Sequence, residues 1–190
     1  MRIRLFYALE LSQATRDKLA DLIDTMQKGI MFSGANPSWV KAESIHLTIK
    51  FLGWTDDTLL PAIIEQTEAA LEGMEPFAFS VRGVSVFPNP RLPRVIWAGV
   101  RKADEELARL HAQIEDSMQT LGFAPEERAF HPHLTLARMK STKGAAGLMK
   151  IVEQHSRDFL GDNVATHLTL FQSDLQPTGA VYTPVRRFDF

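Results

Sequence analysis

Two kinds of apolar pattern alternate along the chain. Short runs rich in aromatic and branched side chains are typical of strands, whereas apolar residues that recur every three or four positions are typical of helices. In the first half, these patterns predict a strand over residues 4–11, a helix beginning at Ser12, a strand over 44–51, a helix near Pro61 and a strand over 77–87.

The second half of the chain shows the same order of elements. The patterns predict strands over residues 95–100, 133–138 and 164–171, a helix that ends at Gly122, and a short helix around residues 148–152. Such self-similarity indicates an internal repeat. Its two copies span approximately residues 3–87 and 94–172.

This repeat predicts one domain over residues 1–190 rather than two independent domains. Each half is too short to bury a good core alone, so we expect the proline-rich segment 88–93 to be a loop within the domain. The expected fold class is α+β, with two lobes related by a pseudo-two-fold axis. Each lobe would be an antiparallel sheet with helices packed outside, the C-terminal strands would complete the sheets, and a cleft would lie between the lobes.

Composition and charge restrict the classes of function. The net charge of −2 provides no global basic field, which argues against a protein that coats RNA but permits an enzyme acting on one phosphate. The absence of cysteine excludes disulfides, thiolate metal sites and a cysteine nucleophile. We find no signal peptide and no apolar run of about 20 residues, so we expect a soluble, cytoplasmic protein with no membrane contact.

The tripeptide His-Leu-Thr occurs at equivalent places in the two halves. Residues i and i+2 of a strand point to the same face, so His46 shares a face with Thr48, and His133 shares a face with Thr135. The apolar residues between them face the opposite side and can bury. If the halves pack symmetrically, two imidazoles and two hydroxyls meet around one small volume.

That set of groups is suited to in-line attack on a cyclic phosphate. One imidazole would take a proton from water while the other gives a proton to the departing ribose oxygen, because an ordinary imidazole titrates near pH 6.5. The hydroxyls of Thr48 and Thr135 would donate hydrogen bonds to the phosphoryl oxygens. This scheme requires no metal. We also find no glycine-rich phosphate loop or dinucleotide fingerprint, and we expect no cofactor.

The segments His46–Gly53 and His131–Arg138 resemble the paired motifs of the two-histidine phosphoesterases. They are most similar to the RNA 2′,3′-cyclic phosphodiesterases, also described as 2′-5′ RNA ligases, and residues 87–97 and 173–182 fit the same family. The resemblance implies a bilobal fold and hydrolysis of a terminal 2′,3′-cyclic phosphate to a 2′-phosphate; some members also join or cleave 2′-5′ linkages. It further implies that His46 is the general acid, which protonates the leaving 3′ oxygen, and that His133 is the general base.

Five other residues have competing interpretations. Lys50 is expected on the same face as His46, and Arg138 ends the second motif strand. Each would either neutralise the charge of a phosphate or be a solvated cation. Phe51 would either stack on a base or join the core. His167-Leu-Thr169 copies the motif, but its place on the last repeated strand favours a structural role. His131 forms a His-x-His pair with His133, which would suit a metal only if a third ligand were present.

The leading hypothesis is therefore a monomeric, metal-independent RNA 2′,3′-cyclic phosphodiesterase that acts on RNA 3′ ends or nucleotides bearing a 2′,3′-cyclic phosphate. One alternative is a phosphodiesterase for small nucleotides or ADP-ribose cyclic phosphate. Another is a non-catalytic module that binds nucleotides or RNA ends. A zinc site at His131 and His133 is a third.

Overall fold

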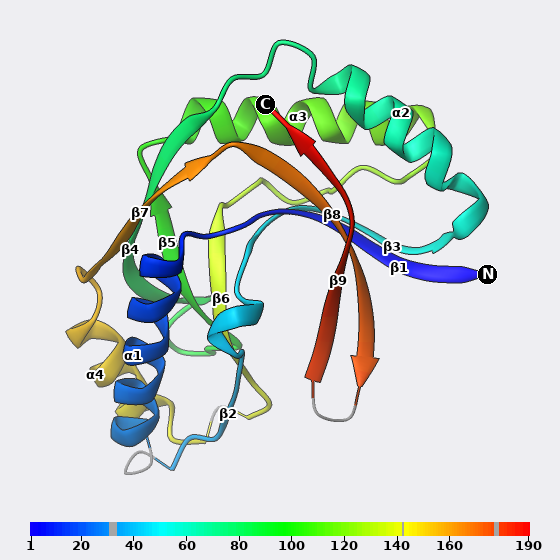
Figure 1. Cartoon of the computed structure of the whole chain (residues 1–190). Helices are drawn as coiled ribbons and strands as arrows, with labels where there is room; N and C mark the ends of the chain where they lie inside the picture. The colour runs from blue at the N-terminus through cyan, green and yellow to red at the C-terminus, as the bar shows by residue number, and fades with distance from the viewer. Residues whose placement is uncertain (31–33, 142, 177–178) are drawn as a thin grey trace.

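The fold combines two antiparallel β-sheets with four α-helices, and the predicted α+β class is confirmed. The computed structural model describes residues 1–30, 34–141, 143–176 and 179–190. Figure 1 shows the sheets curving past one another, with α2 and α3 at one end of the molecule and α1 and α4 at the other. Within the described ranges, no helix combines the length and the apolarity needed to cross a membrane.

The two sheets contain all nine described strands. The four-stranded sheet has the order β3-β1-β8-β9 and consists of β1 (Arg2–Leu9), β3 (Leu47–Asp56), β8 (His167–Gln176) and β9 (Gly179–Asp189). The five-stranded sheet has the order β2-β6-β5-β4-β7 and consists of β2 (Pro37–Trp39), β4 (Phe77–Phe87), β5 (Val95–Arg101), β6 (His133–Met139) and β7 (Phe159–Ala165).

The helices follow the apolar stripes that predict them. They are α1 (Gln13–Ile30), α2 (Leu60–Ala70), α3 (Asp104–Thr120) and α4 (Ala145–Gln154), and short 3₁₀ turns cover Ala42–Ser44 and Asp57–Leu59. The hydroxyl of Ser12 accepts a hydrogen bond from the Thr15 amide at 3.3 Å, which caps the start of α1. Gly122, with φ at +85°, follows the end of α3, where glycine adopts this conformation at little cost.

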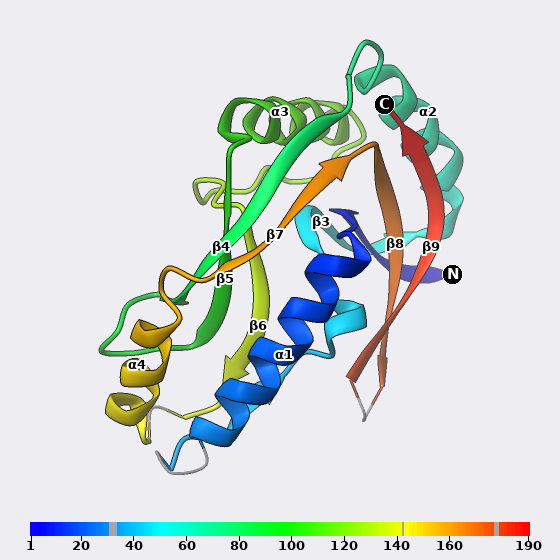
Figure 2. The same ribbon diagram turned by 60° about the vertical axis from the view of Figure 1, so that its left-hand side comes forward.

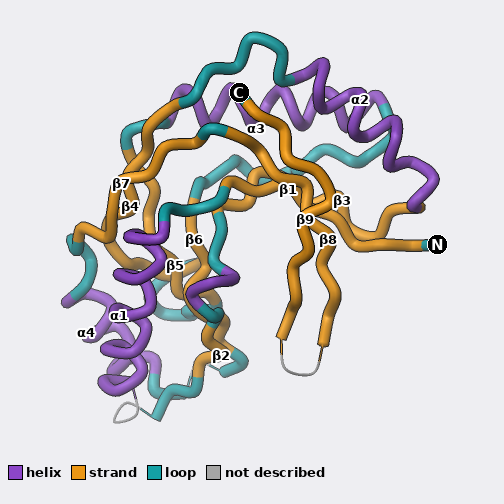
Figure 3. Tube along the Cα trace, in the orientation of Figure 1, coloured by secondary structure: helices purple, strands orange, loops and turns teal. Residues whose placement is uncertain are grey.

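Each sheet takes strands from both halves of the chain. Strand β4 ends the first half but lies between β5 and β7, whereas β8 of the second half lies beside β1. The helices are shared in the same way, because α1 packs against β7 and α4, and α3 packs against β3 and α2. Figure 2 shows this crossing of the chain between the lobes, and Figure 3 shows that residues 88–93 form the loop joining the paired strands β4 and β5.

One predicted strand is wrong, and another begins later than predicted. Residues 164–171 are divided between β7 and β8, because the chain leaves the five-stranded sheet at Thr166 and enters the four-stranded one. The apolar pattern continues across this point without glycine or proline, so it gives no sign of the change. The strand predicted to start at residue 44 starts at Leu47, after the 3₁₀ turn.

A single main core joins the two sheets. Leu5 and Leu47 from the four-stranded sheet and Ile96 and Leu134 from the five-stranded sheet are fully buried in it. A second, smaller cluster on the four-stranded sheet contains Phe6, Ala8 and Phe171, with the partly buried Tyr182 packed against it. This smaller cluster lies against the side chain of His46 and therefore belongs to the candidate site.

Candidate active site

His46 lies immediately before β3 and is held by the preceding 3₁₀ turn. Its Nδ1 atom is 2.9 Å from the carbonyl oxygen of Ser44. A carbonyl oxygen can only accept, so Nδ1 carries the hydrogen in this bond. In the neutral imidazole, Nε2 then has a free lone pair and can exchange a proton with a bound molecule.

His133 has the same local geometry at the start of β6. Its Nδ1 atom is 2.7 Å from the carbonyl oxygen of His131, which is again two residues earlier in the chain. The same argument assigns the hydrogen to Nδ1 and leaves Nε2 available. The two motifs therefore present their imidazoles through matching main-chain hydrogen bonds.

Thr48 and Thr135 are half-buried next to these histidines. Thr48 is aligned with Ala8 of β1, and Thr135 is aligned with Trp97 of β5. In the described part of the chain, neither hydroxyl makes a hydrogen bond. Both are consequently free to donate to an added anion.

A β-bulge follows the threonine in both motif strands. Ile49 is the extra residue of β3, between the pairs Tyr7–Lys50 and Ala8–Thr48. Leu136 is the extra residue of β6, since Ile96 pairs with Ala137 and Trp97 pairs with Thr135. A bulge reverses the alternation of side chains beyond it.

These bulges correct two predictions about side-chain direction. Lys50 does not share the face of His46, because the bulge turns it inward, and its side chain is only 3% exposed. Phe51 does not face the core but is 56% exposed and contacts the ring of Phe6, which in turn lies against His46. Arg138 occupies the equivalent place after the bulge of β6 and is likewise exposed.

Lys50 forms a buried ion pair with α3. Its ammonium group lies 2.7 Å from Oε1 of Glu115 and also donates to the carbonyl oxygen of Ala124. Because its hydrogen-bonding partners come from the protein, the residue links β3 to α3 rather than lining an open surface.

Aromatic side chains surround both imidazoles. The ring of His46 lies 4.7 Å from Phe6 and 5.0 Å from Tyr182, measured between centroids. The ring of His133 lies 5.1 Å from Phe87, which stacks on Trp97 at 4.6 Å. Each histidine thus has an apolar wall that partly excludes water.

Burial changes the acidity of both histidines. It lowers the pKa of His46 to about 4, with a smaller opposing effect from the Ser44 hydrogen bond and a further lowering by the Arg16 guanidinium. Burial also lowers the pKa of His133, and the cation of Arg138 acts in the same direction. In the unliganded protein, both imidazoles are therefore neutral at pH 7.

The two motif strands come together where the sheets meet. Cα atoms of β3 and β6 approach within 8 Å, and Figures 1 and 2 both show the start of β3 beside β6. The segments that carry His46 and His133 are therefore neighbours in space, although the two histidines are 87 positions apart in the sequence.

The third motif copy lies in a different environment. Nε2 of His167 is 2.8 Å from Oε2 of Glu10, and the same oxygen accepts from Thr169 at 3.2 Å and from Arg187 at 2.9 Å. This shared carboxylate joins the end of β1 to β8 and β9. His167 and Thr169 thus have partners within the protein, whereas the hydroxyls of Thr48 and Thr135 have none in the part of the chain that the structure describes.

The described residues near His131 and His133 do not form the ligand cluster that the zinc-site alternative requires. His131 contributes its carbonyl oxygen to His133, and its exposed ring lies 6.5 Å from that of Phe87. Among the residues that the structure describes, no three His, Cys, Asp or Glu side chains are gathered as metal ligands.

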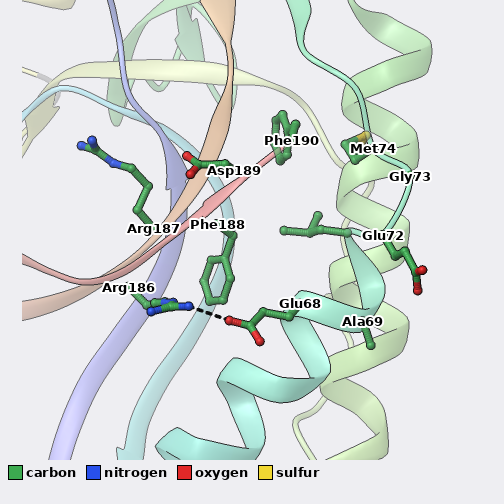
Figure 4. Close-up of a pocket in the computed structure, with 11 residues that line it drawn as sticks. Glu68, Ala69, Glu72, Gly73, Met74, Arg186, Arg187, Phe188, Asp189 and Phe190 are labelled. Carbon is green, nitrogen blue, oxygen red and sulfur yellow. Dashed lines mark hydrogen bonds and ion pairs between the residues drawn. The ribbon is translucent and has the colours of Figure 1, made fainter.

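Two cavities lie outside the space between the motif strands. One, of about 590 Å³, lies between the end of α2 and β9, where Arg186 pairs with Glu68 at 2.8 Å (Figure 4). It contains none of the predicted site residues. The other, of about 500 Å³, is adjacent to His133, since Phe87, Trp97 and His131 line it.

Comparison with known proteins identifies the family. A family profile described as the 2′-5′ RNA ligase superfamily matches residues 15–177. The chain belongs to this superfamily. The resemblance based on the two His-Leu-Thr motifs is thereby confirmed.

Relatives in the superfamily match over nearly the full chain. An RNA 2′,3′-cyclic phosphodiesterase from Methanothermobacter thermautotrophicus is 32% identical over 188 residues, covering 99% of each chain. Another protein of that name, from Archaeoglobus fulgidus, is 33% identical over 187 residues and covers 98% of this chain and 100% of its own.

Solved structures support the superfamily fold. TT0787 of Thermus thermophilus matches with a TM-score of 0.77 and 27% identity, over 98% of this chain and 97% of that chain. E. coli LigT complexed with 3′-AMP matches with a TM-score of 0.76 and 22% identity, over 100% and 99% of the two chains. At that identity, the second likeness concerns the fold alone.

Several neighbours of the superfamily motifs were missed from sequence alone. Phe6 and Tyr182 contact His46 from β1 and β9, and Arg16 influences it from α1. The Nε atom of Arg16 is buried and has no hydrogen-bond partner among the described residues. No spacing links these residues to His46, although Tyr182 lies in a segment that fits the family.

Proposed function

We propose that this protein hydrolyses an RNA-terminal 2′,3′-cyclic phosphate to a 2′-phosphate without a metal ion. The observation that carries the proposal is the matched presentation of His46 and His133. Both donate Nδ1–H to the carbonyl oxygen two residues earlier, and each is followed two residues later by a threonine whose hydroxyl has no hydrogen-bond partner among the described residues. The names of the relatives support the same reaction class.

In this mechanism, His133 acts as the general base. Nε2 takes a proton from water as the water oxygen attacks phosphorus, and the bond from phosphorus to O3′ breaks on the opposite side. His46 gives its Nε2 proton to the departing O3′, so the product carries a 2′-phosphate and a 3′-hydroxyl. Thr48 and Thr135 donate to the two non-bridging oxygens and stabilise the charge that develops on them.

His46 needs an anion beside it to act as the acid. Its pKa is lowered to about 4, mainly by burial, so a proton is scarce on the free protein at pH 7. A bound phosphodiester supplies a negative charge that favours the imidazolium form. Substrate binding would therefore favour the protonated form of His46, which the reaction requires as its general acid.

Arg138 and Phe51 are the proposed substrate contacts outside the motif pairs. The equivalent bulges of β6 and β3 leave both side chains exposed. The guanidinium of Arg138 acts electrostatically on His133 and would also attract phosphate. Phe51 offers a ring for base stacking. We do not assign a substrate contact to Lys50, whose ammonium group is paired with Glu115.

The test is hydrolysis of adenosine 2′,3′-cyclic phosphate in the presence of EDTA. The wild-type protein should retain its turnover in EDTA and release the 2′-phosphate. His46→Ala and His133→Ala should each lower kcat by about 10²–10⁴-fold, the usual value of one proton transfer.

His167→Ala is the matched control, because it removes the imidazole of the third motif copy, which is bonded to Glu10. Its kcat should stay within a factor of a few of wild type. Loss of turnover in EDTA would refute the metal-free mechanism, and equal losses in all three histidine variants would refute the choice of site.

A further inference from the structure

A row of exposed aromatic side chains extends from His46 along the four-stranded sheet. Strand β3 contains two bulges, with Ile49 and Leu52 as the extra residues. Because each bulge shifts the alternation of side chains by one position, the site face receives every third residue of the strand, namely Thr48, Phe51 and Trp54. The side chains of Phe51 and Trp54 are each 56% exposed. Two large rings are thus open to solvent on this face.

One arginine lies among these rings. Arg4 of β1 is aligned with Trp54, as Phe6 is with Phe51, so all four side chains share a face. The guanidinium carbon of Arg4 is 6.0 Å from the centroid of the Phe51 ring, and Nη1 donates to the hydroxyl of Ser173 at 3.2 Å. Among the described residues, Arg4 forms no ion pair with a carboxylate. Its charge is therefore available to an anion from outside the protein.

The row lies on the side of the site where the rest of a substrate strand would be. In the proposed mechanism, water attacks beside His133 and O3′ departs toward His46, so the ribose lies over the four-stranded sheet, and the preceding nucleotide is attached through O5′ of that ribose. Arg4 and Trp54 lie about 6.6 Å beyond Phe6 along the strand. Figure 1 shows β1 and β3 extending together away from β6 toward the N-terminus.

We propose that Trp54 and Arg4 form a subsite for the nucleotide that precedes the cyclic-phosphate end. The base would stack on Trp54, and the phosphate that joins it to the terminal nucleotide would lie against the Arg4 guanidinium. This subsite rests on the proposed function and narrows the preferred substrate class to RNA strands of at least two nucleotides. Because every base has a π-face, stacking on Trp54 would select for strand length and not for sequence.

The experiment compares adenosine 2′,3′-cyclic phosphate with the dinucleotide ApA that ends in a 2′,3′-cyclic phosphate. Release of the 2′-phosphate product is followed by chromatography and expressed as kcat/KM. In the wild-type protein, kcat/KM should be about tenfold higher or more for the dinucleotide, the worth of one stacked base. Trp54→Ala should remove most of this advantage and leave kcat/KM for the mononucleotide within about twofold. Trp54→Phe keeps a ring and should retain most of the advantage.

Phe159 supplies the matched control, because it is another exposed aromatic residue beside a cation. Its ring centroid is 4.9 Å from Nζ of Lys18, but it lies on β7, the outer strand of the five-stranded sheet. Phe159→Ala should leave both kcat/KM values within about twofold. A loss for the dinucleotide as large as that in Trp54→Ala would overturn the subsite.

The salt dependence of kcat/KM tests the role of Arg4. Contact with one further phosphate should make kcat/KM for the dinucleotide fall more steeply with salt, by about 0.7 in the logarithmic slope. Arg4→Gln keeps a hydrogen-bond donor for Ser173 and removes the charge, so the two substrates should then show equal slopes. Equal slopes in the wild-type protein would refute the phosphate contact.

Failure of the subsite and failure of the proposed function give different results. Equal kcat/KM values for the two substrates in the wild-type protein, or equal losses for both in Trp54→Ala, would overturn the subsite alone. Failure of the wild-type protein to hydrolyse either substrate would instead refute the proposed function.

Discussion

The two catalytic candidates share their hydrogen bonding but differ in their surroundings. His46 is enclosed by Phe6 and Tyr182, and burial lowers its pKa to about 4. The pKa of His133 is also lowered, mainly by burial. For both groups the lowered pKa favours the neutral form at pH 7, so the proton required for the acid role becomes more available as the pH falls.

This shift gives a prediction for the pH dependence of kcat/KM, which reports the free enzyme. Both limbs of the profile should lie below pH 6.5, the ordinary value for imidazole, because both pKa values are lowered. Above that pH, kcat/KM should fall about tenfold per pH unit as the acid loses its proton. A plateau that continues beyond pH 7 in steady-state assays would contradict this account.

Arg16 provides the control for that profile. Removing its cation in Arg16→Ala should raise the pKa of His46 and move the alkaline limb to higher pH, since like charge disfavours the imidazolium. Arg16→Lys keeps the charge and should leave the limb nearer to its wild-type position. Identical profiles for the two variants would show that the charge of Arg16 does not act on His46.

At the residue scale, the sequence predicts the two histidines and two threonines of the candidate site but not the residues that surround them. The duplicated His-Leu-Thr tripeptide is a local signal, because its two copies occur at equivalent positions of the repeat. Phe6, Tyr182 and Arg16 come from β1, β9 and α1, and only the packing of these elements brings them to His46. Their roles depend on contacts between distant segments, which no local pattern encodes.

At the element scale, apolar periodicity located nearly all helices and strands but not their irregularities. The bulge at Ile49 cannot be predicted from the sequence, because the residues through Lys50 and Phe51 are equally consistent with a regular strand whose side chains alternate between the two faces. It decides which of these two residues is exposed. The division of residues 164–171 between β7 and β8 was missed for a similar reason, since the strand pattern is continuous there.

The ion pair between Lys50 of β3 and Glu115 of α3 gives a prediction about stability. Lys50→Met would leave the carboxylate of Glu115 buried without its partner, which costs about 3–5 kcal/mol in comparable sites. Urea denaturation followed by circular dichroism would measure the loss.

The double variant Lys50→Met/Glu115→Leu is the control, because it removes both charges together. It should recover most of the stability and keep kcat/KM close to the wild-type value. A double variant that is stable but as inactive as His133→Ala would contradict the structural role assigned to Lys50.

The junction of α1 with β7 gives a second prediction about stability. Gly161 has φ at +140°, and an added Cβ would overlap the side chain of Thr15 on α1. Gly73 has φ at +76° but faces open space, so Gly73→Ala reports conformational strain alone, at about 1–2 kcal/mol. Gly161→Ala should lower the free energy of unfolding by more than Gly73→Ala. Equal losses in thermal or urea denaturation would show that the close approach to Thr15 is unimportant.

At the scale of the whole molecule, the exchange of strands between the two sheets explains how one short chain builds both sides of the candidate site. On the His133 side, β4 of the first half pairs with β5, which in turn pairs with β6. On the His46 side, β8 of the second half pairs with β1, which in turn pairs with β3. Each side of the candidate site therefore depends on both halves of the sequence. The sequence indicated the repeat and the antiparallel sheets. The order of strands within each sheet follows from packing between the halves and required the structure.

The low net charge of −2 fits this arrangement. Because the chain has no global basic field, the proposed substrate would be held by local groups around one phosphate and by aromatic contacts. The rings of Tyr182 and Phe87 lie against His46 and His133, and Phe51 is exposed, so these three side chains are candidates for such contacts.

A crystal structure with adenosine 2′-monophosphate, the product of the proposed reaction, would show whether His46 and His133 act on the same phosphate. We expect one phosphate between the motif strands, with Nε2 of His46 and Nε2 of His133 both within hydrogen-bond distance of its oxygens. The hydroxyls of Thr48 and Thr135 should donate to the same phosphate. A phosphate bound by only one of the two histidines, or bound at the Glu10–His167 cluster, would contradict the account.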